Sequence, residues 1–347
     1  MKKREHMDHK RKRRQEKVRR QKHHERARWT QTQKQEAEPP EYDEDVEIAS
    51  GPSPPLRLRY TSERMHRAMG RLARAQKIET DEDYRQFMNS LIGQDLDAMV
   101  NSLEDDPIEE AQELAFQAME AKGPREALAL AQQALALDPD CVDALSVAAG
   151  MTARSLKEVI PKMQQAVEAG ERALGEDFFE ENRGHFWGIT ETRPYMRARV
   201  ALAQLLQRIG HTDEAVRHYE GMLELNPGDN QGVRDTLLGC YLVMDDLEGA
   251  QRLLQQYKDD FSAVFIWGEV LQRFLGGEIK KATKSLKKAR ERNPYVEDYL
   301  SGNKQRPRNL PDHYSPGEKS EAIYCAQELG PAWESHPEAV AWLNAER

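Results

Sequence analysis

A spacing of small and apolar residues recurs through the chain and limits its fold more than any other feature. In residues 196–227 the spacing runs from Ala203 to Ala215, Tyr219 and Pro227. Each copy predicts two short amphipathic helices joined by a tight turn, because small residues where two helices cross allow close approach. The same steps recur in two further sets, and a looser set lacks the proline: Ala115, Ala127, Ala131, Pro139; Val270, Ala282, Leu286, Pro294; and Leu238, Ala250, Leu254, Ser262.

Turn and cap signals in residues 196–227 agree with a helical hairpin. Gly210 is expected to close the first helix, since glycine adopts the left-handed conformation at little cost. Either Thr212 or Asp213 can accept a hydrogen bond from the free amides of the second helix. Pro227 is expected to stop that helix, because proline has no amide hydrogen to donate.

The repeated hairpin resembles the tetratricopeptide-repeat superfamily. Pro227 and Pro294 are 67 residues apart, close to two units of about 34 residues. The resemblance implies an all-α fold, an α-α superhelix or solenoid whose first helices line a concave face. We assign residues 107–312 to these repeats, with an insertion at 175–195 that breaks the period.

The segments that flank the repeats are predicted to be helical caps. Residues 61–106 hold two expected helices, 62–77 and 81–103, and Gly93 is a point where the second helix bends or breaks. Residues 313–347 are expected to form the other cap, beginning with Ser315 as the N-cap and Pro316 as the first helical residue. Polar caps keep the open ends of a repeat array soluble.

The first 60 residues have a different composition from the rest. The chain carries a net charge of −9, yet residues 1–30 hold fourteen Lys and Arg against four Asp and Glu. An acidic, proline-containing linker follows, with seven acidic and no basic residues between Glu36 and Glu47. So few apolar residues predict disorder. The tail is either a solvated segment or a weak, sequence-independent contact to nucleic acid. The candidate contacts are Lys10, Arg11, Lys12, Arg13, Arg14, Lys17, Arg19 and Arg20.

Several function classes find no support in the sequence. There is no glycine-rich phosphate loop, zinc motif or nucleophile elbow, so we expect no enzyme activity, no cofactor and no metal. The cysteines Cys141, Cys240 and Cys325 are far apart and favour a reducing cytoplasm. No apolar run is long enough to span a membrane, so no membrane partner is expected.

Aromatic residues concentrate in the insertion. Phe178, Phe179, Phe186, Trp187 and Tyr195 lie within or at the end of residues 175–195. Rigid rings beside a repeat groove are suited to binding a partner. They are equally suited to filling the space that the irregular repeat leaves, and the sequence leaves both interpretations open.

An arginine cluster next to the insertion is the second candidate site. Arg197, Gln204 and Arg208 are spaced to lie on one side of a helix. Guanidinium groups pair with both oxygens of a carboxylate, so the cluster suits an acidic peptide or a C-terminal carboxylate. The alternative is pairing within the chain, with Glu191, Asp229 or Asp235. The full set of candidate peptide-binding residues is Trp187, Arg193, Arg197, Arg199, Gln204, Arg208, Asn230, Gln231 and Arg234.

Longer motifs give a closer resemblance, covering roughly residues 105–343. The segments HFWGITETRPYMRAR, LELNPGDNQGVRDTLL, YKDDFSA, YLSGNKQRPRNLPDHYSPGEKSEA and AWESHPEAVAWL resemble a group of bacterial tetratricopeptide proteins. Their C-terminal part is similar to the suppressor-of-tumorigenicity-7 family. This resemblance implies an all-helical fold and no known enzymatic activity.

These observations predict a non-enzymatic interaction scaffold that binds a protein or peptide segment in its concave groove. The alternative is a nucleic-acid-associated factor that uses its basic tail for phosphate contacts.

Overall fold

The computed structural model describes residues 57–78, 80–307, 311 and 313–347. The described residues all belong to one compact unit. The basic tail, the acidic linker and the nucleic-acid candidates from Lys10 to Arg20 therefore lie outside the described residues.

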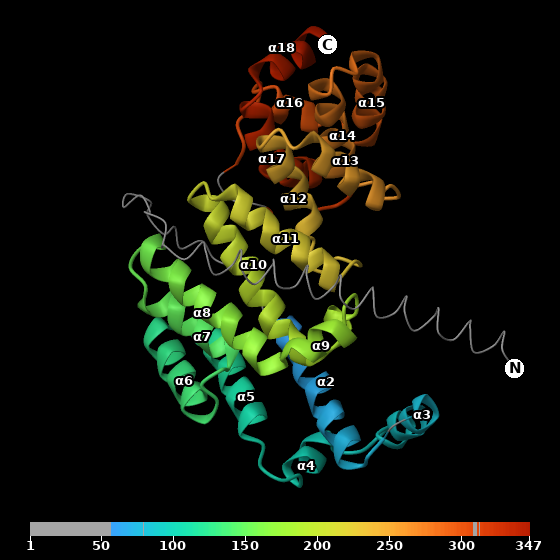
Figure 1. The fold of residues 1–347 in the computed structure, drawn as a ribbon. Helices are drawn as coiled ribbons and strands as arrows, with labels where there is room; N and C mark the ends of the chain where they lie inside the picture. The colour runs from blue at the N-terminus through green and yellow to red at the C-terminus, as the bar shows by residue number, and fades with distance from the viewer. Residues whose placement is uncertain (1–56, 79, 308–310, 312) are drawn as a thin grey trace, which may run out of the picture. The chain divides into compact units, whose positions relative to one another are not determined.

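Helical hairpins build the central part of the described chain, and its regular secondary structure is helical throughout (Figure 1). In each hairpin the first helix packs antiparallel to the second across a short turn. The pairs are α5 (Pro107–Glu120) with α6 (Pro124–Leu137), α7 (Val142–Thr152) with α8 (Leu156–Leu174), α10 (Arg193–Arg208) with α11 (Thr212–Leu225), α12 (Val233–Val243) with α13 (Leu247–Gln256), and α14 (Ala263–Leu275) with α15 (Ile279–Arg292).

The recurrent small residues form the helix crossings, as the spacing predicts. Ala115 of α5 and Ala131 of α6 are fully buried, and Ala203 of α10 and Ala215 of α11 are buried in the same way. The looser set, which runs from Leu238 to Ser262, deviates at its last apolar position, because Leu254 is only half-buried. In the α5–α6 and α10–α11 hairpins the sequence pattern thus identified residues that are buried where the helices pack.

Within residues 196–227, the glycine signal for the end of the first helix was correct, and the cap signal for the start of the second helix was wrong. Gly210 has a φ of +83°, as a left-handed helix end requires. α11 begins at Thr212, with His211 at the N-cap position and no side-chain cap hydrogen bond. His211 instead places its ring nitrogen 2.9 Å from Glu214, so neither Thr212 nor Asp213 caps the helix.

Three helices precede the hairpins: α2 (Arg57–Ala75), α3 (Asp81–Ser90) and α4 (Leu96–Asn101). The break at Gly93 is confirmed, since its φ is +79° and it separates α3 from α4. Residues 57–60, which we had assigned to the tail, belong to α2. The buried ring of Tyr60 lies 5.2 Å from that of Phe116 in α5, and this contact explains the earlier helix start.

The insertion forms a short helix and two 3-10 turns: α9 (Glu176–Glu181), η1 (Phe186–Gly188) and η2 (Thr190–Thr192). Pro194 stands in the first turn of α10, where its missing amide hydrogen leaves no bond unmade. A continuous helix through the insertion is therefore absent, as Pro194 indicated.

After the hairpins come α16 (Val296–Leu300), α17 (Lys319–Glu334) and α18 (Pro337–Ala345). The expected cap at Ser315 is wrong: residues 315–318 form a turn, Gly317 has a φ of +81°, and α17 starts at Lys319. α17 does not extend the stack. It packs on α12 and α14, the first helices of earlier hairpins.

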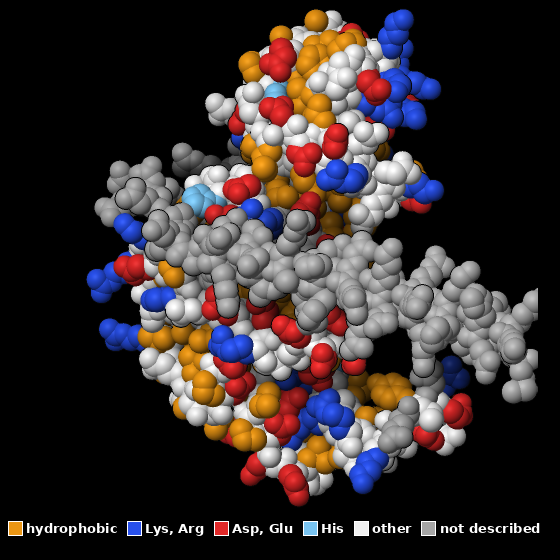
Figure 2. Space-filling view, viewed as in Figure 1, with side chains coloured by type: hydrophobic (Ala, Val, Ile, Leu, Met, Phe, Trp, Pro, Cys, Tyr) orange, Lys and Arg blue, Asp and Glu red, His pale blue; other side chains and the backbone are white. Residues whose placement is uncertain are grey.

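The described surface mixes acidic and basic side chains, with Lys and Arg gathered over α15 at the upper right of Figure 2. Along α15, Lys280, Lys284, Lys287 and Lys288 are exposed. No described helix is both long and apolar enough to cross a membrane.

Glycine permits the close approach of α12 and α17. A Cβ atom on Gly239 would lie 2.5 Å from the backbone oxygen of Glu328. Gly239→Ala is therefore expected to destabilise the fold by ~1–3 kcal/mol, as overpacking does. Urea unfolding measures this change.

Gly150→Ala is the matched control, because Gly150 lies within α7 and its Cβ atom would meet nothing within 4 Å. There, the helix preference for alanine should stabilise the fold by up to about 1 kcal/mol. Equal effects of the two substitutions would contradict the close approach.

Candidate binding face

The first helices of the hairpins contact one another in two groups, α5 with α7 and α7 with α10, and then α12 with α14. We call the surface of these five helices the inner face. Two helices from outside the hairpins lie on it. α2 contacts α5 and the η2 turn that leads into α10, whereas α17 contacts α12 and α14. The chain thus places one of its own helices on each half of the face on which we expected a partner.

Arg197 of α10 joins α2 to the inner face. Its Nη1 and Nη2 donate to the two carboxylate oxygens of Glu63 at 2.7 and 3.0 Å, a bidentate pair. On its other edge, Nε and Nη2 donate to Asp143 of α7 at 3.0 and 2.5 Å. One guanidinium therefore connects three helices.

This site is buried and fully paired. The side chains of Glu63 and Asp143 are 5% and 3% exposed. Burial disfavours the charged guanidinium, but the adjacent Asp143 and Glu63 carboxylates outweigh burial and raise the pKa of Arg197 above its ordinary value. Gln112 of α5 donates to Asp143 at 2.7 Å, so Asp143 is held from both α5 and α10.

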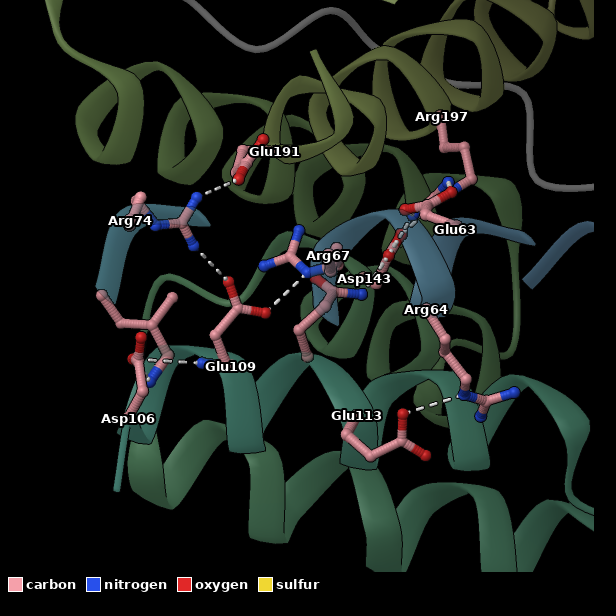
Figure 3. Close-up of polar contacts among 12 residues, drawn as sticks. Glu63, Arg64, Arg67, Arg74, Asp106, Glu109, Glu113, Asp143, Glu191 and Arg197 are labelled. Atoms are coloured by element: carbon pink, nitrogen blue, oxygen red, sulfur yellow. Dashed lines mark hydrogen bonds and ion pairs between the residues drawn. The ribbon is translucent and has the colours of Figure 1, made fainter. Parts of the chain in front are cut away.

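Besides Arg197 of α10, three arginines of α2 face carboxylates across the same contact (Figure 3). Arg67 pairs with Glu109 at 2.8 Å, and both side chains are about nine-tenths buried. The remaining contacts are Arg64 with Glu113 and Glu120, each at 2.8 Å, and Arg74 with Glu109 at 3.4 Å and Glu191 at 2.9 Å.

α17 is held on the other half of the inner face mainly by close packing. Ala322, Cys325, Ala326 and Leu329 are fully buried, and small residues among them allow the close approach to α12. Polar contacts support it: Thr236 of α12 donates to Glu328 at 2.8 Å. Glu321 accepts from the backbone amide of Ala263 at 3.1 Å and from the Asn293 side chain at 3.0 Å.

Asp235 of α12 lies buried beside this contact. One of its carboxylate oxygens has no hydrogen-bond partner among the described residues. Burial raises the pKa of Asp235 to about 7; Arg234 opposes this rise, while Asp260, Glu328 and Asp229 add to it. Burial also raises the pKa of Glu328.

The aromatic insertion forms a packed cluster. Phe186 is fully buried, and its ring lies 4.9 Å from that of Phe179 and 6.0 Å from that of Phe178. Tyr195 closes the cluster at 5.2 Å from Phe179. This geometry favours the space-filling interpretation for these rings.

Trp187, a candidate site residue, is half-buried and pairs with another candidate. The Arg193 guanidinium stacks over the Trp187 ring at 5.2 Å from its centroid. Arg193 Nε also donates to the Trp187 carbonyl oxygen at 3.2 Å.

The remaining candidates form separate groups. Arg199 donates to the Tyr195 hydroxyl at 2.9 Å. Arg234 pairs with Asp229 at 3.2 Å, as our intrachain alternative expected, and with Asp260 at 2.8 Å. Gln231 donates to the Met196 carbonyl oxygen at 3.3 Å, whereas Asn230 is exposed.

Gln204 and Arg208 are the two candidates that remain exposed on α10. Their spacing of seven and eleven residues from Arg197 puts them on the same side of the helix. They extend the inner face beyond the part that Arg197 connects to α2.

No group of described His, Cys, Asp and Glu side chains has the arrangement of a metal site. Burial raises the pKa of Cys141 and of Cys240 to about 12, and that of Cys325 well above its ordinary value. These thiols are therefore protonated at neutral pH, which disfavours nucleophilic chemistry.

Sequence reasoning missed the partners of the arginines. Glu63, Asp143 and Glu109 were not singled out, nor were Glu321 and Glu328 of α17. A signal was present, since Arg64, Arg67, Arg71 and Arg74 recur at three- and four-residue steps. That pattern indicates a basic helix side but does not name the surface opposite.

Removal of the central guanidinium is expected to be costly. Arg197→Ala leaves Glu63 and Asp143 buried without their cation, so we expect a loss of ~3–5 kcal/mol in the free energy of unfolding. Arg208→Ala, on the same side of α10 but exposed, should change it by no more than about 0.5 kcal/mol. Urea unfolding compares the two, and a small loss at Arg197 would contradict a structural role.

Asp235 is expected to make stability depend on pH. Because its folded-state pKa is raised, its contribution favours the folded chain at low pH and is lost as pH rises through about 7. Asp235→Asn should therefore raise the free energy of unfolding at pH 8, on the order of 3 kcal/mol, and much less at pH 4. The exposed Asp259→Asn is the control; an equal effect of Asp235→Asn at both pH values would disprove the assignment.

Comparisons with known proteins do not assign the chain to a family. No family model and no curated protein matches the chain, so the resemblance to the suppressor-of-tumorigenicity-7 family gains no support. Among solved structures the chain is similar to YrrB, described as a TPR protein with an unusual peptide-binding site, at 17% identity over 56% of this chain and 90% of that chain, with a TM-score of 0.38.

It is also similar to the nearly identical TPR-like repeats of a putative kinesin light chain from Podosopora anserina, at 14% identity over 54% of this chain and 96% of that chain, with a TM-score of 0.36. The fold assignment rests on the hairpins themselves. Small residues are buried in them, and the first and second helices follow one another along the chain in the same way from hairpin to hairpin. In its described residues the chain is an all-α protein built of successive helical hairpins.

Proposed function

We propose that this chain is a non-enzymatic adaptor that binds a segment of a partner protein on its inner face. The observation that carries the proposal is that the inner face binds helices within the chain. α2 contacts it through arginine–carboxylate pairs, and α17 contacts it through packing and hydrogen bonds.

Residues Gln204 and Arg208 are where the proposal places a partner. Both are exposed, and both share the side of α10 on which Arg197 pairs with two carboxylates. A guanidinium and an amide on one helix side suit an acidic side chain or a C-terminal carboxylate. Three buried free cysteines favour a reducing compartment, and we propose the cytoplasm.

Substitution of the exposed pair tests this role without removing a buried ion pair. Gln204→Ala with Arg208→Glu is expected to lower partner capture from the native lysate at least about tenfold, since one lost charge-assisted contact is worth ~1.5–3 kcal/mol. Affinity capture with mass spectrometry measures the loss. Arg217→Glu is the control, because Arg217 is exposed on α11, a second helix.

Undiminished capture by the Gln204→Ala, Arg208→Glu variant would remove the partner from this part of α10. Arg197 and Arg234 are unsuitable for such a test. Both occupy ion pairs with buried carboxylates, so their reversal would also change stability.

A second candidate function rests on the charge of residues 1–30, which hold fourteen Lys and Arg against four acidic residues. Under this alternative the candidate contacts from Lys10 to Arg20 bind nucleic acid weakly and without base recognition. Nuclease treatment separates the two functions, since it abolishes capture that runs through nucleic acid on the tail and leaves capture through the inner face unchanged.

A further inference from the structure

α2 has its apolar core elsewhere than on the inner face. Its buried Met69 and Leu72 pack with Phe87 and Leu91 of the α3 region, and with apolar side chains of α4. A separate cluster in α5, α6 and α7 holds Ala111, Ala115, Ala131 and their neighbours. Hydrophobic packing therefore ties α2 to α3 and α4 more than to the hairpins.

The contact between these two clusters is largely ionic. Arg64, Arg67 and Arg74 of α2 meet Glu109, Glu113, Glu120 and Glu191, and Glu63 meets Arg197. The Tyr60–Phe116 ring pair, with the Arg64 guanidinium 5.1 Å from the Phe116 centroid, adds an apolar contact at one end. Polar contacts of this kind resemble transient interfaces between domains.

We define the acidic seat as Glu109, Glu113, Glu120 and Glu191, the carboxylates outside α2 that pair with its arginines. We propose that the acidic seat is a docking site for an arginine-bearing amphipathic helix of a partner protein, and that α2 is the chain's own occupant, which such a helix displaces. The proposal rests on the proposed function of the inner face. To the carboxylate that Gln204 and Arg208 suit, it adds a second contact, a basic helix that competes with α2 for the acidic seat.

α2 shows which residues a partner helix needs. Its arginines at 64, 67 and 74 lie on the side that faces the acidic seat, and Glu63, one position before the first, reaches Arg197. A partner with the same order of charges and an aromatic residue three positions before its acid would reproduce these contacts. Charge complementarity thus selects a basic helix over an acidic one.

Apolar space beside α2 gives a partner helix further contact. A groove of about 730 Å³ runs between α2, α4 and α5. Met65, Leu96, Val100 and Leu103 line it, together with acidic side chains, and Met65 is 47% exposed. A partner helix with a larger apolar residue at the position of Met65 gains burial that α2 does not have.

Attachment to the same chain favours α2 over an equal competitor. A tethered helix acts at an effective concentration in the millimolar range, so a free peptide of the same sequence competes poorly with it. Weakening α2 in place should therefore reveal the acidic seat to the peptide. This difference between intact and weakened chain is the basis of the test.

The experiment uses the full chain and a fluorescent peptide of residues 57–77, followed by fluorescence anisotropy. Arg64→Glu with Arg67→Glu in the chain places negative charges of α2 opposite Glu109, Glu113 and Glu120, so that the two sides repel each other. We expect the peptide to bind this variant at least about tenfold more tightly than the unmodified chain. Arg85→Glu is the control variant, because Arg85 is exposed on α3, and it should bind like the unmodified chain.

A second peptide carrying the Arg64→Glu and Arg67→Glu changes should not bind. Equal binding of both peptides, or no binding of the first peptide to a variant with unchanged helicity, would overturn the proposal. Arg64→Ala with Arg67→Ala is the milder variant if the reversal unfolds the chain, since Arg74 still pairs with Glu109. A doubled molar mass of the unmodified chain in light scattering would assign the acidic seat to a second copy and overturn the partner.

Peptide binding does not depend on the partner captured from the lysate, so the two proposals can fail separately. Lost peptide binding with retained capture would overturn the acidic seat alone. Retained peptide binding with capture unaffected by Gln204→Ala, Arg208→Glu would overturn the α10 site alone.

Discussion

The ion pairs of Arg197 fix the arrangement on which the rest of the inner face depends. Glu63 and Asp143 come from helices on either side of α10, and both carboxylates are removed from water. Neither can be left without a cation at acceptable free energy, so α2, α7 and α10 hold one relative position or the charges must return to water together. α17 is attached by a different physical means, because glycine and alanine bring its backbone against α12.

This difference divides the inner face into two halves with different kinds of contact. Its first half presents carboxylates to a basic helix, and its second half is closed by tight packing. The exposed Gln204 and Arg208 extend beyond the buried pair of Arg197. Under our proposal the first half can exchange its occupant, because the pairs of Arg64 and Arg74 are partly exposed to water, whereas the packed second half keeps the fold together.

The sequence predicted the hairpins well because their contacts are local. The small residues Ala203 and Ala215 are both buried within one hairpin, and Gly210 and Gly93 act through their own backbone angles. The start of α17 was misplaced because Ser315 also fits a turn. The seats of α2 and α17 could not be predicted, since helix spacing reveals which side of Arg197 is polar but not that Glu63, 134 residues away, would meet it. The arginines therefore separated into groups with different partners.

Hydrogen exchange of the unmodified chain, followed by mass spectrometry, tests the central claim most directly. If ionic contacts hold α2 and packing holds α17, the amides of α2 exchange through an opening of lower free energy than those of α17 and α12. Added salt, at about 1 M, then lowers the protection of α2 by screening the partly exposed pairs of Arg64 and Arg74, and leaves the protection of α17 unchanged. Equal protection of the two helices, with the same response to salt, would contradict the account.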